Sequence, residues 1–339
     1  MYLLIKTPCR QLRPKVNNYN LTVEKGEGYD LNMSLFERLV RKGYPHETLV
    51  SQHRMRPEIS SIIRHLTYPD LQDALKTKGR PDLRGVQDNI IFINHDHPED
   101  QLFNVADTRD MGSKSSKQNI YEARMTLKIV RYLAQQGYGT DNMVVLTPYL
   151  GQLRKLQEEL EAENDPVLND LDSYDLIRAG LLTPGDTKMT KRRLRLATIG
   201  EFSCFMPSTQ NLNMSADNYQ GEESDIVIAS LTRSNADNDI GFMMAPERLN
   251  VLLSRARNGL IMIGNSTTFT KSKKGGALWQ NFFAYIQRHV YDGFPVKCEQ
   301  HPQRKALLSS ELQFEHHCPD GGCAESWYVS VTLWIFLPN

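Results

Sequence analysis

The sequence predicts an α/β fold in which a parallel sheet is covered by helices on both faces. Short apolar runs such as NIIFIN (89–94) are typical of buried strands. Amphipathic segments such as 118–136 lie between these runs and are typical of helices. Strands that alternate with helices of about ten or more residues favour parallel pairing, because each connection must cross over the sheet.

The first half of the chain carries clear start and stop signals for this alternation. Ser34 is suited to cap a helix, Pro57 to begin one, and Gly137 to end one. The expected elements are, in order, a helix over 32–41, a short strand over 48–51, a helix over 57–66, a strand over 89–94, a polar surface loop over 98–118, a helix over 118–136 and a strand over 143–146.

The second half continues the alternation without an internal repeat. The expected elements are a helix over 152–163, strands over 192–199 and 226–231, a helix over 246–254, a strand over 259–263 and an aromatic-bearing helix over 275–289.

Composition limits the function classes. The 339 residues suffice for one large domain or two smaller ones, and 40 basic residues balance 40 acidic residues. A nucleic-acid site must therefore be a local patch rather than a whole-chain field. No run approaches the roughly 18 apolar residues of a membrane span, and no signal peptide is visible. Five scattered cysteines do not form a disulfide framework, so we expect a location in the cytoplasm or nucleus.

Four polar motifs fall at strand ends or helix starts, where open α/β sheets place ligands. They are QLRP (11–14), SQHRMRP (51–57), DNYQGEESD (217–225) and RLNVLLSRAR (248–257). A single arginine is usually a solvated surface charge. Arg54 and Arg255, however, stand where a strand or helix meets apolar core, and an arginine fork at such a position favours a bound phosphate.

Together with VVLTPYLGQ (144–152), these motifs resemble the second RecA-like domain of superfamily 1 RNA helicases of the nonsense-mediated-decay type. The similarity is greatest to the NFX-type zinc-finger helicases. It covers roughly residues 10–290, and its strength lies in five individually weak motifs that occur in the family's order. The resemblance implies a remnant of the first RecA-like domain over 1–44 and the second RecA-like domain over 45–290.

The resemblance also implies an ATP site that uses Mg²⁺. Gln11 would sense the γ-phosphate or its attacking water, and Arg54 and Arg255 would be arginine fingers that reach across a domain cleft. Glu223 would bind the nucleotide ribose, and Gly221 would allow the backbone to approach closely. The other cofactor-binding candidates are Gln220 and His53. At His53 the family has a tyrosine that packs on adenine, so a partly buried loop histidine remains an equal alternative.

A single-stranded nucleic acid is the substrate that the resemblance implies. Thr147, Pro148 and Tyr149 would lie near its sugar–phosphate backbone, which suits a motor that needs no sequence readout. RNA is the expected strand, although these motifs leave DNA open. We assign Arg233, at the end of the 226–231 strand, no role beyond a salt bridge.

The tail suggests a second chemistry. Cys298, His301, Cys318 and Cys323 supply four soft ligands, the number that tetrahedral zinc needs. We therefore expect a Cys/His-rich zinc region over 291–326, which the resemblance to NFX-type helicases also implies. The alternative is a tail of reduced cysteines without a metal.

Several features point to a fragment. No G-x-x-x-x-G-K-[ST] phosphate loop occurs in the sequence, and no Asp-Glu pair precedes Gln11 at a strand end. In the family these elements belong to the first RecA-like domain, so we expect a truncated chain or a paralogue that lost catalysis. The segment 200–216 interrupts a motif that the family keeps continuous, and 327–339 turns abruptly apolar. We interpret both as intron-derived sequence, with a tolerated surface insertion as the alternative for 200–216.

The sequence thus predicts the C-terminal motor domain of an ATP-dependent RNA helicase in RNA surveillance or RNA silencing. Its expected partners are single-stranded RNA and proteins of RNA decay or silencing. The 339-residue chain alone is expected to lack ATPase activity. The alternatives are a non-catalytic module that binds RNA or protein, and a fragment of a DNA helicase.

Overall fold

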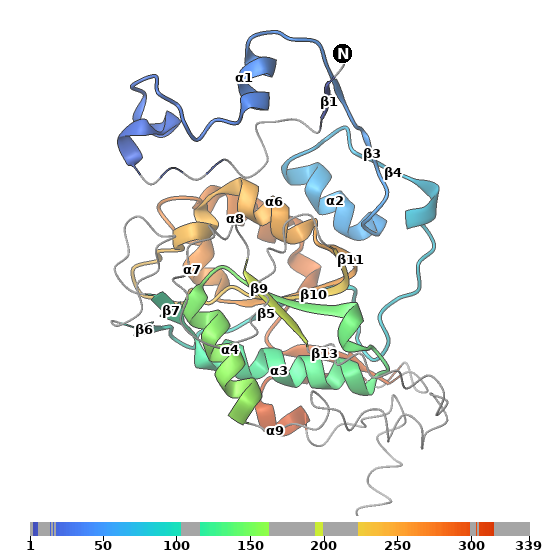
Figure 1. Ribbon diagram of the computed structural model, residues 1–339. Coiled ribbons are helices and arrows are strands. Elements are labelled where there is room, and N and C mark those ends of the chain that lie inside the picture. The colour runs from blue at the N-terminus through green and yellow to red at the C-terminus, as the bar shows by residue number, and fades with distance from the viewer. Residues whose placement is uncertain are drawn as a thin grey trace, which may run out of the picture.

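The computed structural model describes residues 3–5, 14, 16, 18–102, 116–162, 194–198, 223–298, 303 and 305–314 (Figure 1). At its centre lies a six-stranded, wholly parallel sheet with the order β12-β5-β11-β10-β8-β9. The strands are β5 (Ile90–Asn94), β8 (Met143–Thr147), β9 (Arg195–Thr198), β10 (Ser224–Ser230), β11 (Ala256–Gly264) and β12 (Val290–Tyr291). The predicted fold class is confirmed.

Helices cover both faces of this sheet, as the sequence predicts. Figure 1 shows α2, α6 and α8 on one face and α3 and α4 on the other. The described helices are α1 (Leu35–Arg41), α2 (Pro57–Leu66), α3 (Ile120–Gln135), α4 (Leu150–Ala162), α6 (Pro246–Leu253), α7 (Ser266–Thr270), α8 (Gly276–Tyr285) and α9 (Glu311–Phe314). In this part of the chain, no helix is long and apolar enough to cross a membrane.

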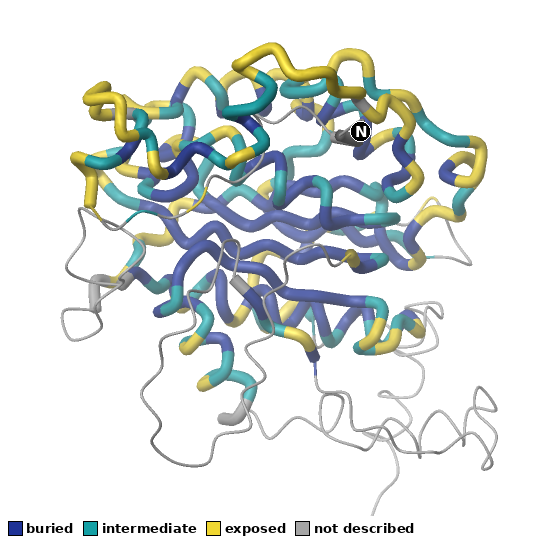
Figure 2. Tube along the Cα trace, turned by 45° about the horizontal axis from the view of Figure 1, so that its top comes forward, coloured by how far each residue is buried: buried dark blue, intermediate teal, exposed yellow. Residues whose placement is uncertain are grey.

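The central strands contain uninterrupted apolar runs, such as IIFI in β5 and MVVL in β8, because both faces of the sheet are buried. In β5, Ile90 and Phe92 pack into the core under α2, α6 and α8. Their neighbours Ile91 and Ile93 pack into the second core, with α3 and α4. Figure 2 shows the sheet as a continuous buried layer between the two helical layers.

The predicted helix boundaries agree well with the structure. Ser34 caps α1 by accepting a 3.1 Å hydrogen bond from the Glu37 backbone N–H. Gly137 follows α3 with a φ of 87°, a left-handed conformation that glycine adopts without strain.

Four short strand pairs surround the main sheet and refine the predicted loops. They are β1 (Leu3–Ile5) with β2 (His46–Thr48), β3 (Ser51–Gln52) with β4 (Gln72–Asp73), β6 (Asp100–Leu102) with β7 (Ser116–Gln118), and β13 (Phe294–Lys297) with β14 (Lys305–Leu308). The strand expected over 48–51 is wrong as a single element, because β2 and β3 pair with different partners. The expected loop over 98–118 begins and ends in the β6–β7 pair, and its residues 103–115 lie outside the described residues.

The folded core continues past residue 290. Strand β12 pairs with β5, and Phe294 and Leu308 of the β13–β14 hairpin are buried among core residues. The segments 200–216 and 327–339, interpreted above as intron-derived, lie outside the described residues.

A partly buried carboxylate, Asp73, ties strand β4 to strand β3 and to helix α2. It accepts hydrogen bonds from Gln52 Nε2 at 2.6 Å, Ser60 Oγ at 2.6 Å and Arg64 at 2.9 Å. Burial by itself raises the pKa of this carboxyl, but these hydrogen bonds outweigh burial and leave the pKa below its ordinary value.

We therefore expect the Asp73 hydrogen bonds to make stability depend on pH. Because the pKa is lower in the folded state, the carboxylate stabilises the fold above about pH 4, and this contribution is lost as the pH falls through the folded-state pKa. In urea unfolding, Asp73→Asn should be destabilising at neutral pH, with a deficit that shrinks in acid. The exposed neighbour Asp70 provides the control Asp70→Asn. A deficit that stays constant from about pH 7 to pH 3 would contradict this assignment.

Candidate functional site

The structure divides the predicted site residues between opposite edges of the sheet. All six strands are parallel, so their amino ends form one edge and their carboxyl ends the other. Glu223 directly precedes β10 and Arg255 directly precedes β11, which places both at the amino edge. Thr147 ends β8 and is followed by Pro148 and Tyr149, which places these three at the carboxyl edge. The residues predicted to bind nucleotide, Glu223 and Arg255, are thus separated by the length of the strands from the three residues predicted to contact nucleic acid.

At the amino edge, Arg54 and Glu223 meet although they are 169 positions apart in the sequence. The Arg54 Nε donates to the Glu223 carboxylate, and a second guanidinium nitrogen donates to the Ser254 carbonyl at 2.9 Å. The loop that carries Arg54 is held by the buried Gln52, whose Oε1 accepts the backbone N–H groups of Arg54 at 2.9 Å and Met55 at 2.8 Å. This loop is therefore preorganised.

Arg54 and Glu223 face a cavity of about 290 Å³. Its lining residues are Ser51, Gln52, His53, Arg54, Met55, Lys76, Glu223 and Ser254. Three predicted site residues therefore share one cavity, namely His53, Arg54 and Glu223. Lys76 also lines it, and no sequence motif indicated that residue.

Arg255 belongs to the same edge but is largely buried, with 9% of its surface exposed. Its backbone carbonyl accepts a 3.1 Å hydrogen bond from Ser224 N–H, which joins the start of β11 to the start of β10. The prediction that Arg255 is an arginine finger stays a prediction. Gln11, Gln220 and Gly221 lie outside the described residues.

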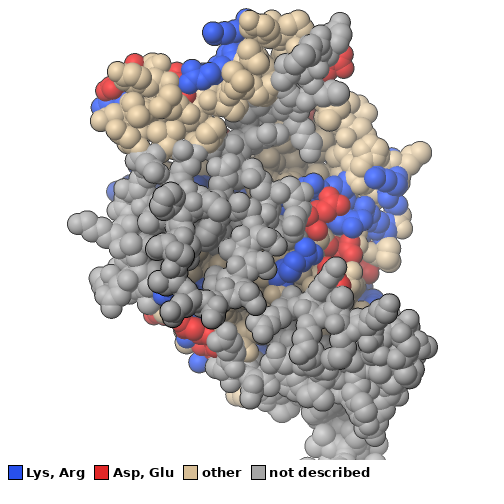
Figure 3. Space-filling model, viewed as in Figure 1, with Lys and Arg blue, Asp and Glu red and all other residues tan. Residues whose placement is uncertain are grey.

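A second arginine, Arg257, faces Glu223 from β11. Its Nε lies 3.7 Å from a Glu223 carboxylate oxygen and 3.6 Å from an Asp225 carboxylate oxygen. Arg80 donates to the Arg257 carbonyl at 3.0 Å, and burial together with the positive charge of Arg257 lowers the pKa of Arg80. Figure 3 shows acidic and basic side chains interleaved on the side of the molecule where β3 and the start of β11 lie in Figure 1. Closely spaced cations at one edge favour an anionic ligand.

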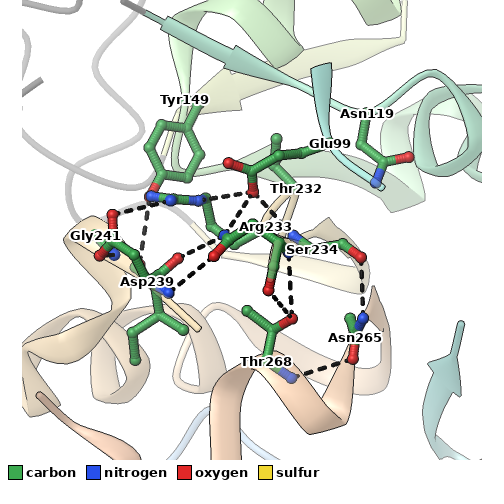
Figure 4. Close-up of polar contacts among 12 residues, drawn as sticks. Glu99, Asn119, Tyr149, Thr232, Arg233, Ser234, Asp239, Gly241, Asn265 and Thr268 are labelled. Carbon is green, nitrogen blue, oxygen red and sulfur yellow. Dashed lines mark hydrogen bonds and ion pairs between the residues drawn. The ribbon is translucent and has the colours of Figure 1, made fainter. Parts of the chain in front are cut away.

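At the carboxyl edge, Arg233 is the centre of a buried polar network (Figure 4). Its guanidinium contacts Glu99 at 2.9 Å, the Tyr149 hydroxyl at 3.2 Å and Asp239 at 3.0 Å. The side chains of Arg233 and Glu99 are each only 3% exposed. Burial disfavours the charge on Arg233, but Tyr149, Glu99 and Asp239 together raise its pKa, so it stays protonated. The predicted salt bridge is confirmed, and the contact with Tyr149 extends it.

The residue before Arg233 has an unusual backbone. Thr232 is fully buried and has a φ of 70°, which a β-branched residue rarely adopts. Its N–H donates to the buried Glu122 carboxylate at 2.7 Å, and its hydroxyl lies 3.3 Å from the Thr147 hydroxyl. Glu122 therefore holds this turn in a strained conformation that connects the ends of β10 and β8.

The three residues predicted to lie near nucleic acid are buried. Thr147 is 0% exposed, Tyr149 is 1% exposed, and Pro148 is also buried. The Tyr149 hydroxyl is engaged by Arg233 and by the Ile240 carbonyl at 3.3 Å. Their contact with nucleic acid stays a prediction.

Of the four predicted zinc ligands, the described part of the chain includes Cys298, which follows β13 and is partly exposed. His301, Cys318 and Cys323 lie outside it. Among the described residues, no group of three or more His, Cys, Asp or Glu could hold a metal ion.

Comparison with protein families decides the identity of the fold. A family model described as an AAA domain matches residues 31–267, which includes most of the sheet as well as Arg54 and Arg255. The chain belongs to the AAA-domain family. Together with its relatives, this match confirms the resemblance to superfamily 1 helicases of the nonsense-mediated-decay type.

Three curated relatives are similar to this chain, and one of them has the word helicase in its name. NFX1-type zinc finger-containing protein 1 of Mus musculus is 29% identical over 95% of this chain, which spans 14% of that protein. "Helicase required for RNAi-mediated heterochromatin assembly 1" of Schizosaccharomyces pombe is 30% identical over 78% of this chain and 21% of the relative. "Regulator of nonsense transcripts 1" of Dictyostelium discoideum is 28% identical over 80% of this chain and 17% of the relative. The AAA domain described here thus corresponds to a minor part of these longer proteins.

Proposed function

We propose that this chain is the C-terminal motor domain of an ATP-dependent RNA helicase that acts in RNA surveillance or RNA silencing. The observation that carries the proposal is the amino-edge cavity, where His53, Arg54 and Glu223 converge. The relatives support the pathway, since their names refer to RNAi-mediated heterochromatin assembly and to nonsense transcripts. Proteins of RNA silencing or RNA decay are the corresponding partners, in the nucleus or cytoplasm.

In this proposal the amino edge binds ATP with its Mg²⁺. The Glu223 carboxylate accepts a hydrogen bond from a ribose hydroxyl, and Arg54 donates to phosphate oxygens with its planar fork. Arg255 stands next to Ser254, whose carbonyl holds Arg54, and serves as the second arginine finger. In this site the arginines stabilise the negative charge of the phosphates. The sequence contains no phosphate loop, whose serine or threonine usually binds Mg²⁺.

The ion pair between Arg54 and Glu223 has a consequence for this binding. The Arg54 guanidinium is hydrogen-bonded to the Glu223 carboxylate in the structure. A bound nucleotide must therefore replace this contact with hydrogen bonds to each of the two side chains. An incoming phosphate and ribose together offer one acceptor to Arg54 and one donor to Glu223, so neither charge is left unpaired.

The carboxyl edge is the proposed site of single-stranded RNA, with single-stranded DNA as the alternative. It lies across the sheet from the cavity, which allows one domain to contact nucleotide and strand at the same time. The Arg233 network supports the site by holding Tyr149 and the 232–235 turn in one arrangement. Zinc bound by Cys298, His301, Cys318 and Cys323 is a proposal for the tail.

A binding titration with a fluorescent ATP analogue tests the nucleotide site. We expect the wild-type chain to bind saturably, and Arg54→Ala and Glu223→Ala each to weaken binding about tenfold or more, because a charge-assisted hydrogen bond is lost in each case. Arg154 is exposed on α4, which covers the face of the sheet opposite α2, and it does not line the cavity. Arg154→Ala is therefore the matched control and should bind as wild type. A chain that binds single-stranded RNA but no nucleotide would favour the non-catalytic module instead.

A further inference from the structure

Lys76 is a cation of the amino-edge cavity that belongs to none of the helicase-like motifs. We propose that Lys76 is a further ligand of the bound nucleotide and contacts its phosphate groups. The inference rests on the proposed function, because it assumes that this cavity takes a nucleoside triphosphate.

The position of Lys76 is built by the β3–β4 pair. Strand β4 pairs in parallel with β3, and the Ala74 N–H donates to the Gln52 carbonyl at 3.0 Å. The chain then turns through a 3₁₀ helix (Leu75–Thr77) whose last residue, Thr77, is fully buried and donates its hydroxyl to the Ala74 carbonyl at 2.8 Å. These contacts fix the Lys76 backbone beside the loop that carries Arg54.

The charges of the cavity leave Lys76 uncompensated. Among the described residues, Glu223 is the only acidic one that lines the cavity, and its carboxylate is already contacted by Arg54 and Arg257. Within the described residues, no ion pair or hydrogen bond engages the Lys76 ammonium, and its side chain is exposed. A cavity with this balance attracts an anion.

The chemistry of lysine favours phosphate as that anion. An ammonium is a compact point charge with three donors, which suits phosphate oxygens, whereas Arg54 offers a planar fork. Two cations that line one cavity match a polyphosphate chain, which carries charge along its length. A nucleoside without phosphates offers Lys76 no such partner.

Equilibrium titration of the full 339-residue chain with fluorescent ATP and fluorescent adenosine tests this role. Lys76→Ala should weaken ATP binding about tenfold, the size expected when one charge-assisted hydrogen bond is lost, and should leave adenosine binding unchanged. Lys78, two positions on, is also exposed and does not line the cavity, so Lys78→Ala is the matched control and should bind ATP as wild type. Lys76→Arg keeps the charge and should retain most of the affinity.

The outcomes separate the two proposals. If Arg54→Ala weakens ATP binding but Lys76→Ala behaves like Lys78→Ala, the role of Lys76 is overturned and the nucleotide site stands. Equal losses of ATP and adenosine binding in Lys76→Ala would also overturn the phosphate contact. If the wild-type chain binds no ATP saturably, both proposals fall.

Discussion

Replacing Arg233 by alanine is expected to lower the free energy of unfolding by about 3–5 kcal/mol. The guanidinium and the Glu99 carboxylate are each only 3% exposed, so the substitution leaves an uncompensated negative charge in the interior. Such a loss is a large fraction of the roughly 5–15 kcal/mol that stabilises a typical domain. Equilibrium unfolding in urea, followed by circular dichroism, measures the change.

Two companion variants locate the origin of this loss. Asp239 is 64% exposed at its contact with Arg233, so Asp239→Asn should cost no more than about 1 kcal/mol. Arg233→Met removes the charge but keeps much of the volume and should remain strongly destabilising, because Glu99 still loses its partner. If Arg233→Ala proves no more destabilising than Asp239→Asn, the buried pair is not the source of stability inferred above.

The second large effect concerns catalysis. We expect the purified 339-residue chain to release no phosphate from ATP above the uncatalysed background. Arginine fingers stabilise charge that develops on phosphates already held by a phosphate loop and Mg²⁺, and this sequence contains no G-x-x-x-x-G-K-[ST] loop. Phosphate release measured over hours, with and without single-stranded RNA, tests the expectation.

The decisive comparison for catalysis is Arg255→Ala. Trace hydrolysis that persists in this variant would come from a contaminating ATPase and would leave the prediction intact. Turnover that disappears with Arg255→Ala would show that the chain holds a complete site, and the expectation of inactivity would be wrong. Binding of the ATP analogue should be measured for both proteins, so that a misfolded variant is recognised.

Much of the fold was predictable because local sequence patterns, such as apolar runs and helix-starting prolines, indicate the same elements that the folded chain buries. NIIFIN (89–94) became β5, and the helix signalled by Pro57 became α2 over the predicted residues. The strand expected over 48–51 failed because its residues are divided between two pairings with distant segments, β1 and β4. No local pattern specifies a pairing between segments that are far apart in the chain.

The candidate site was predictable only in part. The sequence motifs indicated Arg54 and Glu223 individually as candidate nucleotide ligands, but the ion pair between them depends on how β3, β10 and α6 are arranged. Lys76 has no motif, and its place in the cavity follows from the short β3–β4 pair. Arg257 lies in the S-R-A-R sequence two positions after Arg255, but its contact distances to Glu223 and Asp225 depend on how β10 and β11 pair, which the motif does not specify.

The sequence by itself determined the alternation of helices and strands, the family and the residue types available for binding phosphate. These properties are encoded locally, by hydrophobic period, caps and short motifs. The tertiary structure decided that Arg54, Glu223 and Arg255 lie at one edge of the sheet and that Thr147, Pro148 and Tyr149 lie at the opposite edge. It also decided that Arg233 is buried against Glu99 and Tyr149 rather than displayed on the surface. The physical reason is that parallel strand order and desolvation depend on contacts between segments far apart in the chain, and no single stretch of sequence contains them.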